Sequence, residues 1–221
     1  MPRFVDAWVA AWRMHAFKWE AIYSVTALVL TLVLMEVLLL RIEVWQGVVF
    51  ADPLLGLFPP TDVHWIIYSL VYSAVLFGFV SLCLHPFALL LTARALIILI
   101  IMRIACLFLL PLGPPADIIP LSDPFMLYLG VPTTNVRGMF FAWHPAMLAL
   151  LGYAAQWKDL KVIFSIGVVV VSVLLLVQHT HYTIDLVAAP VFAYAAVGIA
   201  KWHTVGGFGS RAESKPPSTL L

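Results

Sequence analysis

The stretch GVVVVSVLLLVQHTHYTIDLVAAP, residues 167–190, decides the fold of this 221-residue chain. It contains the apolar run Val168–Val177, and a second apolar segment follows His181 and reaches Ala200. Such segments indicate membrane-spanning helices, because roughly 20 mostly apolar residues cross the hydrocarbon core of a bilayer. Two histidines and an aspartate lie between the two segments. The stretch therefore predicts a helical hairpin that carries titratable groups at one surface of a membrane protein.

The composition of the whole chain supports this interpretation. Hydrophobic residues make up 63% of the sequence, charged residues only 10%, and the mean hydropathy is +1.04. Soluble domains carry about 25% charged residues, so we expect an integral membrane protein with one domain. The formal net charge of +1 gives no electrostatic reason to expect a nucleic-acid partner. Cys83 and Cys106 lie in apolar runs, which predicts buried thiols rather than a disulfide framework.

Six segments have the composition of membrane spans, which predicts an all-α integral membrane protein, a six-transmembrane helix bundle with long outer-face loops. The last three segments are short, so we expect polar residues at their ends. The six segments are Ala21–Leu40, Trp65–Leu84, Phe87–Leu112, Met139–Gln156, Val162–Val177 and Tyr182–Ala200.

Residues 1–20 are predicted to form an amphipathic helix in the membrane interface. Aromatic side chains fall in one stripe at helical spacing, and charged side chains lie opposite. The stripe is Phe4, Trp8, Trp12 and Trp19, and the opposite face carries Asp6, Arg13 and Glu20. The alternative is a solvent-exposed start to the first span. No cleavable signal peptide is expected, because no small-residue cleavage site follows a short apolar core. Residues 21–202 would form the six-span domain, and residues 203–221 a flexible cytoplasmic tail.

Lysine and arginine residues are distributed unevenly between the two sides of the predicted bundle. The amino end, the QWKDLK loop and the carboxyl end carry most of them, whereas the other side has only Arg41 and Arg137. The positive-inside rule then predicts a protein of the cell (inner) membrane with both termini in the cytoplasm and QHTH facing the periplasm or exterior. Two long loops, residues 42–64 and 111–138, share that outer face. We interpret the second loop as a lid or an interfacial segment.

The outer face gathers a group of residues suited to acid–base chemistry. His144 precedes Pro145, and proline is favoured at the first helical position, so His144 is expected near a helix amino-terminus. His181 and Asp185 are four residues apart, or one helical turn, so the carboxylate can hold the imidazole in one tautomer. His179 lies beside them.

This arrangement suits phosphoryl transfer without a metal or other cofactor. His181 would attack phosphorus and form a phosphohistidine. His144 would protonate the departing lipid oxygen and later take a proton from water or an acceptor alcohol. Three alternatives stay open: the histidines are polar anchors at the ends of spans, or His144, His179, His181 and Asp185 bind zinc, or two histidines bind a haem.

Two ionisable residues lie inside the predicted spans. Arg103 is well within LIILIIMRIACLFLL, and Glu36 is nearer the outer end of the first span. A charge at the bilayer centre usually has a partner or faces a wet cavity. Either Glu36 and Arg103 form an ion pair, or Arg103 faces the cavity and binds phosphate together with Arg137.

The segment HTHYTIDLVAAP, residues 179–190, closely resembles the His-Tyr-Thr-x-Asp segment of sphingomyelin synthases and their bacterial relatives. These enzymes belong to the lipid phosphate phosphatase superfamily, which includes the type-2 phosphatidic acid phosphatases. FPPTDVHWIIYSLVYS, RIACLFLLPLGPP and MFFAWHPAML are similar to further segments of that family in the same order. The resemblance implies a six-span bundle with an outer-face site. It also implies that His181 is the nucleophile, Asp185 its orienting acid and His144 the general acid.

The chain departs from the family pattern at three places, one of which is Gly138, where the synthases often have an aspartate. Ala142-Trp143-His144-Pro145 stands where the family usually has Ser-Gly-His-Thr, so a hydroxyl and a backbone N–H are missing. Leu175 stands where the classical phosphatases carry an arginine, which fits the synthase-like branch. We therefore expect slow turnover.

The sequence as a whole predicts a lipid phosphatase or headgroup phosphotransferase whose partner is a membrane lipid substrate. The alternative is a weak or inactive homologue that binds or transports an anionic lipid. The residues expected to bind substrate are Arg103, Arg137, His179, Trp143 and Tyr182.

Overall fold

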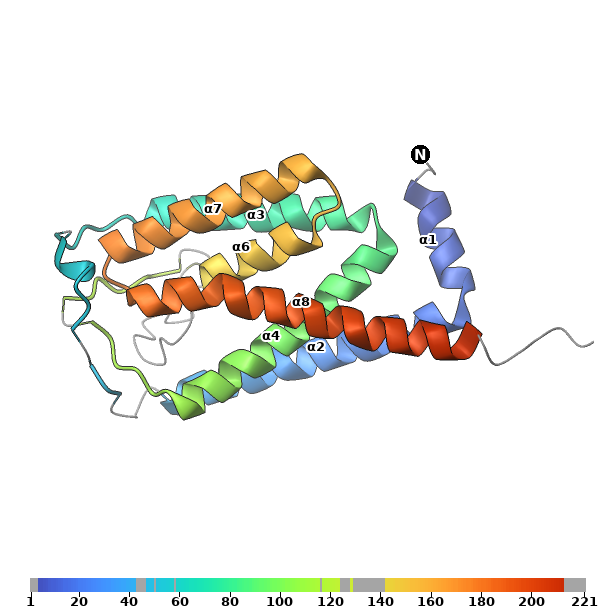
Figure 1. Ribbon diagram of the computed structural model, residues 1–221, viewed down its shortest axis with the longest axis horizontal. Coiled ribbons are helices and arrows are strands. Elements are labelled where there is room, and N and C mark those ends of the chain that lie inside the picture. Colours follow the sequence, from blue (N-terminus) through green and yellow to red (C-terminus); the bar gives the residue numbers. More distant parts are fainter. Residues whose placement is uncertain are drawn as a thin grey trace, which may run out of the picture.

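The computed structural model describes residues 4–42, 47–49, 51–57, 59–115, 117–123, 128 and 142–212. It consists of long helices joined by loops, with one short 3-10 helix, η1 (Leu55–Leu57). Five long helices run along the molecule and α1 lies across one end of them (Figure 1). The helices are α1 (Phe4–Arg13), α2 (His15–Ile42), α3 (His64–Cys83), α4 (Pro86–Leu109), α6 (Trp143–Ala154), α7 (Lys158–Val177) and α8 (Thr183–Ala212).

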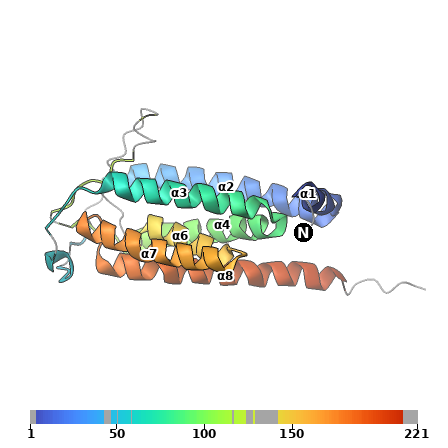
Figure 2. The same ribbon diagram turned by 90° about the horizontal axis from the view of Figure 1, so that it is seen from above.

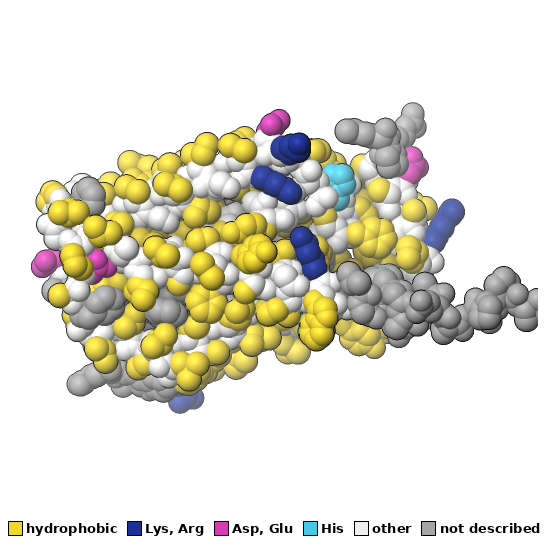
Figure 3. All heavy atoms as spheres, viewed as in Figure 1, with side chains coloured by type: hydrophobic (Ala, Val, Ile, Leu, Met, Phe, Trp, Pro, Cys, Tyr) yellow, Lys and Arg dark blue, Asp and Glu magenta, His cyan; other side chains and the backbone are white. Residues whose placement is uncertain are grey.

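Five helices are long and apolar enough to cross a membrane: α2, α3, α4, α7 and α8. Large apolar side chains are exposed along all five, and Figure 3 shows hydrophobic side chains over most of one face of the molecule. Contiguous exposed apolar surface on this scale is typical of proteins surrounded by lipid. The predicted all-α class is therefore confirmed for the described residues, and five of the six predicted segments form helices long and apolar enough to cross a membrane.

The fourth predicted span differs from the other five. Within the described residues, Met139–Gln156 is helical only as α6, which has 12 residues. A helix of that length is about 18 Å long at 1.5 Å per residue, against the roughly 30 Å of a bilayer core. The helices α2, α3, α4, α7 and α8 are thus long enough to span a bilayer, whereas α6 is a short helix inside the bundle.

Helix α6 forms the centre of the molecule. Eight of its residues are buried, and it packs most closely on α7 and α8 (Figures 1 and 2). Its contact with α4 and α8 consists largely of alanines, which let helix backbones approach closely. These are Ala95 of α4, Ala146 and Ala149 of α6, and Ala189, Ala193, Ala196 and Ala200 of α8.

The amino-terminal segment is divided into two helices at Met14. Ala11 and Phe17 are buried in a cluster with Leu90 of α4, and the change of direction between α1 and α2 lets both reach it. The indole Nε1 of Trp8 donates a hydrogen bond to the carbonyl of Cys83 at 2.8 Å. The predicted single helix over residues 1–20 therefore ends at Arg13, because burial of Phe17 requires a turn before it.

Helix α8 continues beyond the predicted span to Ala212. Residues 203–212, predicted as part of a flexible tail, are thus helical. The first proline after Pro190 is Pro216, so no proline interrupts the helix over this region. Residues 213–221 lie outside the described residues.

The turn between α7 and α8 ends α7 with a left-handed residue. The N–H of Thr180 donates to the carbonyl of Leu175 at 3.1 Å, and the N–H of His179 donates to that of Leu176 at 3.0 Å. These two bonds form a Schellman motif, whose left-handed position is usually glycine. Here His179 occupies that position, with φ of 56°.

We expect His179→Gly to be more stable than His179→Ala by about 1 kcal/mol, because both remove the imidazole but only glycine adopts positive φ without strain. Thermal unfolding of the two variants in the same detergent measures the difference. An alanine variant as stable as the glycine variant would show that this backbone conformation is not strained.

Candidate functional site

Asp185 is the buried carboxylate at the start of α8. It is fully buried, and its Oδ2 accepts a hydrogen bond from the N–H of Tyr182 at 3.1 Å. Asp185 is the third residue of α8, so it reaches back to the residue before the helix, as the acid of a capping box does. The Nδ1 of His181 lies 3.5 Å from the same Oδ2. His181 stands before the helix begins, so the pair forms across the cap rather than along a helical face.

The start of α6 lies beside the start of α8. The N–H of Ala142 donates to the backbone carbonyl of Asp185 at 3.3 Å. Helix α6 begins at Trp143, so Pro145 is its third residue and not its first, as the sequence had suggested. Proline is tolerated there because the first N–H groups of a helix have no partner within the helix. His144 is thereby held in the first turn of α6, next to Asp185.

His144 packs against α3 and faces the other charged groups. The ring of Tyr68 meets it edge to face, with centroids 5.6 Å apart and planes at 85°. It interacts electrostatically with His181 and Arg103. Two buried polar atoms of this cluster, Nδ1 of His144 and Oδ1 of Asp185, have no hydrogen-bond partner in the described part of the chain. Buried polar atoms are rarely left unsatisfied, so such a pair is typical of a site for water or a ligand.

Arg103 brings a cation from α4 to the same end of the bundle. Its Cζ lies 5.8 Å from the ring centroid of Trp143, and its charge interacts with that of Asp185. Glu36 is exposed on α2. An ion pair between α2 and α4 is made instead by Glu20 and Arg94. These contacts favour the interpretation in which Arg103 faces the site over the one in which it pairs with Glu36.

Asp52 joins the loop after α2 to the start of α8. Its Oδ2 accepts a hydrogen bond from the N–H of Thr183 at 2.6 Å, and its Oδ1 accepts one from the Thr183 hydroxyl at 3.1 Å. Burial raises the pKa of Asp52, but the hydrogen bonds from Thr183 and Leu54 outweigh it and hold the pKa below its usual value. Asp52 was not among the site residues predicted from the sequence, and its contact with Thr183 spans 131 residues, so no local pattern indicates it.

Gln178 ties two further loops to the same turn. Its side-chain Oε1 accepts a hydrogen bond from the N–H of Val63 at 3.3 Å, and its backbone carbonyl accepts one from the N–H of Ile119 at 3.3 Å. The hydroxyl of Tyr72 on α3 donates to the carboxylate of Asp123. The loop after α4 is therefore held over the start of α8 and against α3.

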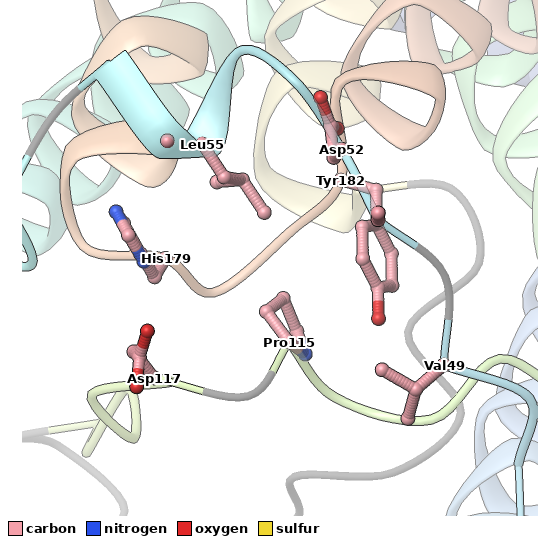
Figure 4. Close-up of a pocket in the computed structure, with 9 residues that line it drawn as sticks. Val49, Asp52, Leu55, Pro115, Asp117, His179 and Tyr182 are labelled. Carbon is pink, nitrogen blue, oxygen red and sulfur yellow. The ribbon is translucent and has the colours of Figure 1, made fainter.

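A pocket of about 370 Å³ opens beside Asp52 and the turn before α8. In Figure 4, His179 and Asp117 lie on one side of the pocket and Tyr182 on the other, with Pro115 between them. Two of the residues predicted to bind substrate, His179 and Tyr182, thus line this pocket. Trp143 and Arg103 lie instead in the cluster with His144. Asp117 was not predicted from the sequence, and an isolated aspartate in a proline-rich loop gives no signal for it.

The remaining predictions concern Arg137 and metal binding. Arg137 and most of the predicted lid lie outside the described residues. Within the described ranges, no group of three or more histidine, cysteine or acidic side chains is arranged to hold a metal ion. His144, His179, His181 and Asp185 therefore do not form a zinc ligand set there.

No family model matches this chain, and no curated protein matches it.

We expect Asp52→Asn to lower stability by about 1 kcal/mol at neutral pH, because the capping carboxylate at the start of α8 loses its charge. The folded-state pKa of Asp52 is depressed, so its contribution is present above the unfolded pKa of about 3.9 and disappears as pH falls through the folded value. Thermal unfolding of both proteins from about pH 3, roughly one unit below the unfolded pKa, to about pH 8 measures how this contribution depends on pH.

The matched control is Asp117→Asn, an exposed carboxylate on the other side of the same pocket. It should leave the unfolding temperature unchanged. Equal effects of the two substitutions on the unfolding temperature would contradict a specific stabilising role for the hydrogen bonds between Asp52 and Thr183.

Proposed function

We propose that this protein is an integral membrane lipid phosphatase or headgroup phosphotransferase that acts through a phosphohistidine. The observation that carries the proposal is the meeting of His181, Asp185, His144 and Arg103 at the starts of α6 and α8. In this proposal the chain crosses the cell (inner) membrane six times, with α6 as a short fourth crossing. Both termini are cytoplasmic and the site faces the periplasm or exterior.

In the first half of the reaction, a nitrogen lone pair of His181 attacks phosphorus. Since Nδ1 faces Asp185, Nε2 is the attacking atom, and Asp185 balances the charge that develops on the ring. The phosphorus–oxygen bond to the lipid breaks as the nitrogen–phosphorus bond forms. His144 transfers its proton to the leaving lipid oxygen, because an alkoxide is a poor leaving group.

In the second half, His144 removes a proton from water or from an alcohol. The resulting oxygen nucleophile attacks phosphorus, the nitrogen–phosphorus bond breaks, and His181 returns to its neutral form. Water gives net hydrolysis, and an alcohol gives transfer of the phosphoryl group. The same groups serve both outcomes.

Arg103 is the group that would offset the negative charge of the phosphate. Its guanidinium is held over the ring of Trp143, and a cation over an aromatic face is attracted to it. A fixed cation beside a developing charge stabilises a transition state without reorganisation. Trp143 stands where the family that this segment resembles usually has glycine, so this packing supports binding of phosphate and also narrows the space for the lipid.

The buried Nδ1 of His144 and Oδ1 of Asp185 give the proposal its strongest support beyond the residue types. A structural anchor or a helix cap is satisfied by its own neighbours, as Oδ2 of Asp185 is. The two remaining atoms have no such partner in the described residues, although both are buried. A bound phosphate, with a protonated His144, would supply one of the missing partners.

We expect His181→Ala to abolish the acid-labile phosphoenzyme formed with radiolabelled phosphatidic acid and to lower phosphate release at least about 100-fold. Asp185→Asn should lower release less, because the imidazole remains. Trapping of the labelled protein at high pH, where phosphohistidine persists, measures the intermediate. The matched control is His203→Ala, which removes an exposed histidine near the other end of α8.

Full phosphate release by His181→Ala would overturn the proposal. Lipid binding by the unaltered protein without any phosphoenzyme would favour the alternative of a non-enzymatic lipid binder. Two specific observations favour that alternative, the bulk of Trp143 and the missing backbone N–H of Pro145.

We expect Arg103→Leu to weaken binding of vanadate, a phosphate analogue, at least about tenfold, and Arg103→Lys to weaken it less because the charge is kept. Competition of vanadate with phosphoenzyme formation measures the affinity. Unchanged affinity in Arg103→Leu would mean that Arg103 serves only to pack against Trp143.

A further inference from the structure

A second concave surface lies between α7 and α8, toward the other end of α6. Both helices pack closely on α6, but they make few contacts with each other. The groove between them has a volume of about 660 Å³, and Gly152 and Tyr153 of α6 lie along it. It involves none of the residues assigned to the phosphoryl-transfer site.

The groove combines two lysines with an apolar wall. Lys161 of α7 and Lys201 of α8 both line it and both are exposed. Among the described residues, no acidic side chain lines it. Figure 3 shows lysine and arginine side chains gathered on this face toward the end where α7 begins. Two cations that share one groove repel each other, and an anion between them removes that repulsion.

The position of the lysines matches a membrane boundary. Lys161 lies in the first turn of α7, and Lys201 is two residues before the end of the part of α8 that can span a membrane, Thr183–His203. The phosphates of lipids lie at this depth, and lysines near the surface attract anionic lipids. Tyr153 and Tyr194 meet edge to face with ring centroids 5.5 Å apart, and such amphipathic rings favour the same interface.

The rest of the groove is shaped for a hydrocarbon chain. Val168 of α7 and Val197 of α8 line it, and Gly198 leaves open space where a side chain would project. A free inorganic anion would gain nothing from these apolar contacts, whereas an acyl chain would bury apolar surface along them.

We propose that the groove binds one anionic phospholipid, with its phosphate between Lys161 and Lys201 and an acyl chain between α7 and α8. The site is separate from the phosphoryl-transfer site, so it holds whether or not the protein is an enzyme. Its ligand is recognised by charge at one end and by apolar contact along the groove.

Native mass spectrometry of the full chain in detergent tests the proposal with two probes, dioleoylphosphatidylglycerol and dioleoylphosphatidylcholine. The unaltered protein should retain the anionic lipid in preference to the zwitterionic one. In Lys161→Gln/Lys201→Gln that preference should fall about 30-fold, the effect of losing two charges near the phosphate. The control is Lys158→Gln/Lys201→Gln, which removes equal charge but only one groove lysine, and should retain more of the preference.

A second variant separates the apolar wall from the charges. A Cβ added at Gly198 would meet no atom within 4 Å, so Gly198→Leu should fold normally and fill the groove. We expect it to lose the bound anionic lipid although both lysines remain. Millimolar inorganic phosphate should not displace the lipid.

Three results would overturn the proposal: equal retention of both lipids by the unaltered protein, unchanged preference in the double lysine variant, or full retention in folded Gly198→Leu. Displacement by inorganic phosphate would instead make the groove a simple anion site. Phosphoenzyme formation in the same variants tests the phosphoryl-transfer proposal independently, because none of these residues belongs to that site.

Discussion

The arrangement of this protein depends on the burial of one carboxylate, Asp185. A buried charge is costly unless hydrogen bonds and an opposite charge compensate for it. Here the compensation comes from the N–H of Tyr182, from the facing Nδ1 of His181 and from the charge of Arg103. These partners belong to α4 and to the turn before α8, and the backbone carbonyl of Asp185, on α8 itself, also accepts a hydrogen bond from the start of α6. The contacts of this one residue, through its side chain and its backbone, thus join α4, α6 and α8.

The short length of α6 shapes both ends of the bundle. Because α6 is surrounded by other helices, its first turn projects His144 into an enclosed space and not toward lipid. At its other end α7 and α8 diverge over it, and the groove with Lys161 and Lys201 results. The same central helix therefore supports the proposed reaction site and the proposed lipid site, although the two share no residue.

The loops at the end that carries His181 act as a second layer over the helix starts. Asp52 supplies the cap that Tyr182, as the residue before α8, cannot supply with its own side chain. Gln178 joins two other loops to the same turn. The left-handed backbone at His179 is the local cost of ending α7 abruptly enough for this turn to fit. Strain of this kind persists where surrounding contacts hold the backbone in place, as the hydrogen bonds of Asp52 and Gln178 do here.

The sequence by itself determined the features that depend on neighbours along the chain. Apolar runs predicted the five helices of spanning length. The sequence also placed His181 and Asp185 close together, although their contact forms across the cap of α8 and not along a helical face. Tertiary structure alone decided that α6 is a short central helix, that Arg103 lies over Trp143 and that Asp52 caps α8. Asp52 and Thr183 are separated by 131 residues, and no local pattern encodes such a contact. Periodicity reports which face of a helix is apolar, but packing decides which helix, loop or lipid covers that face.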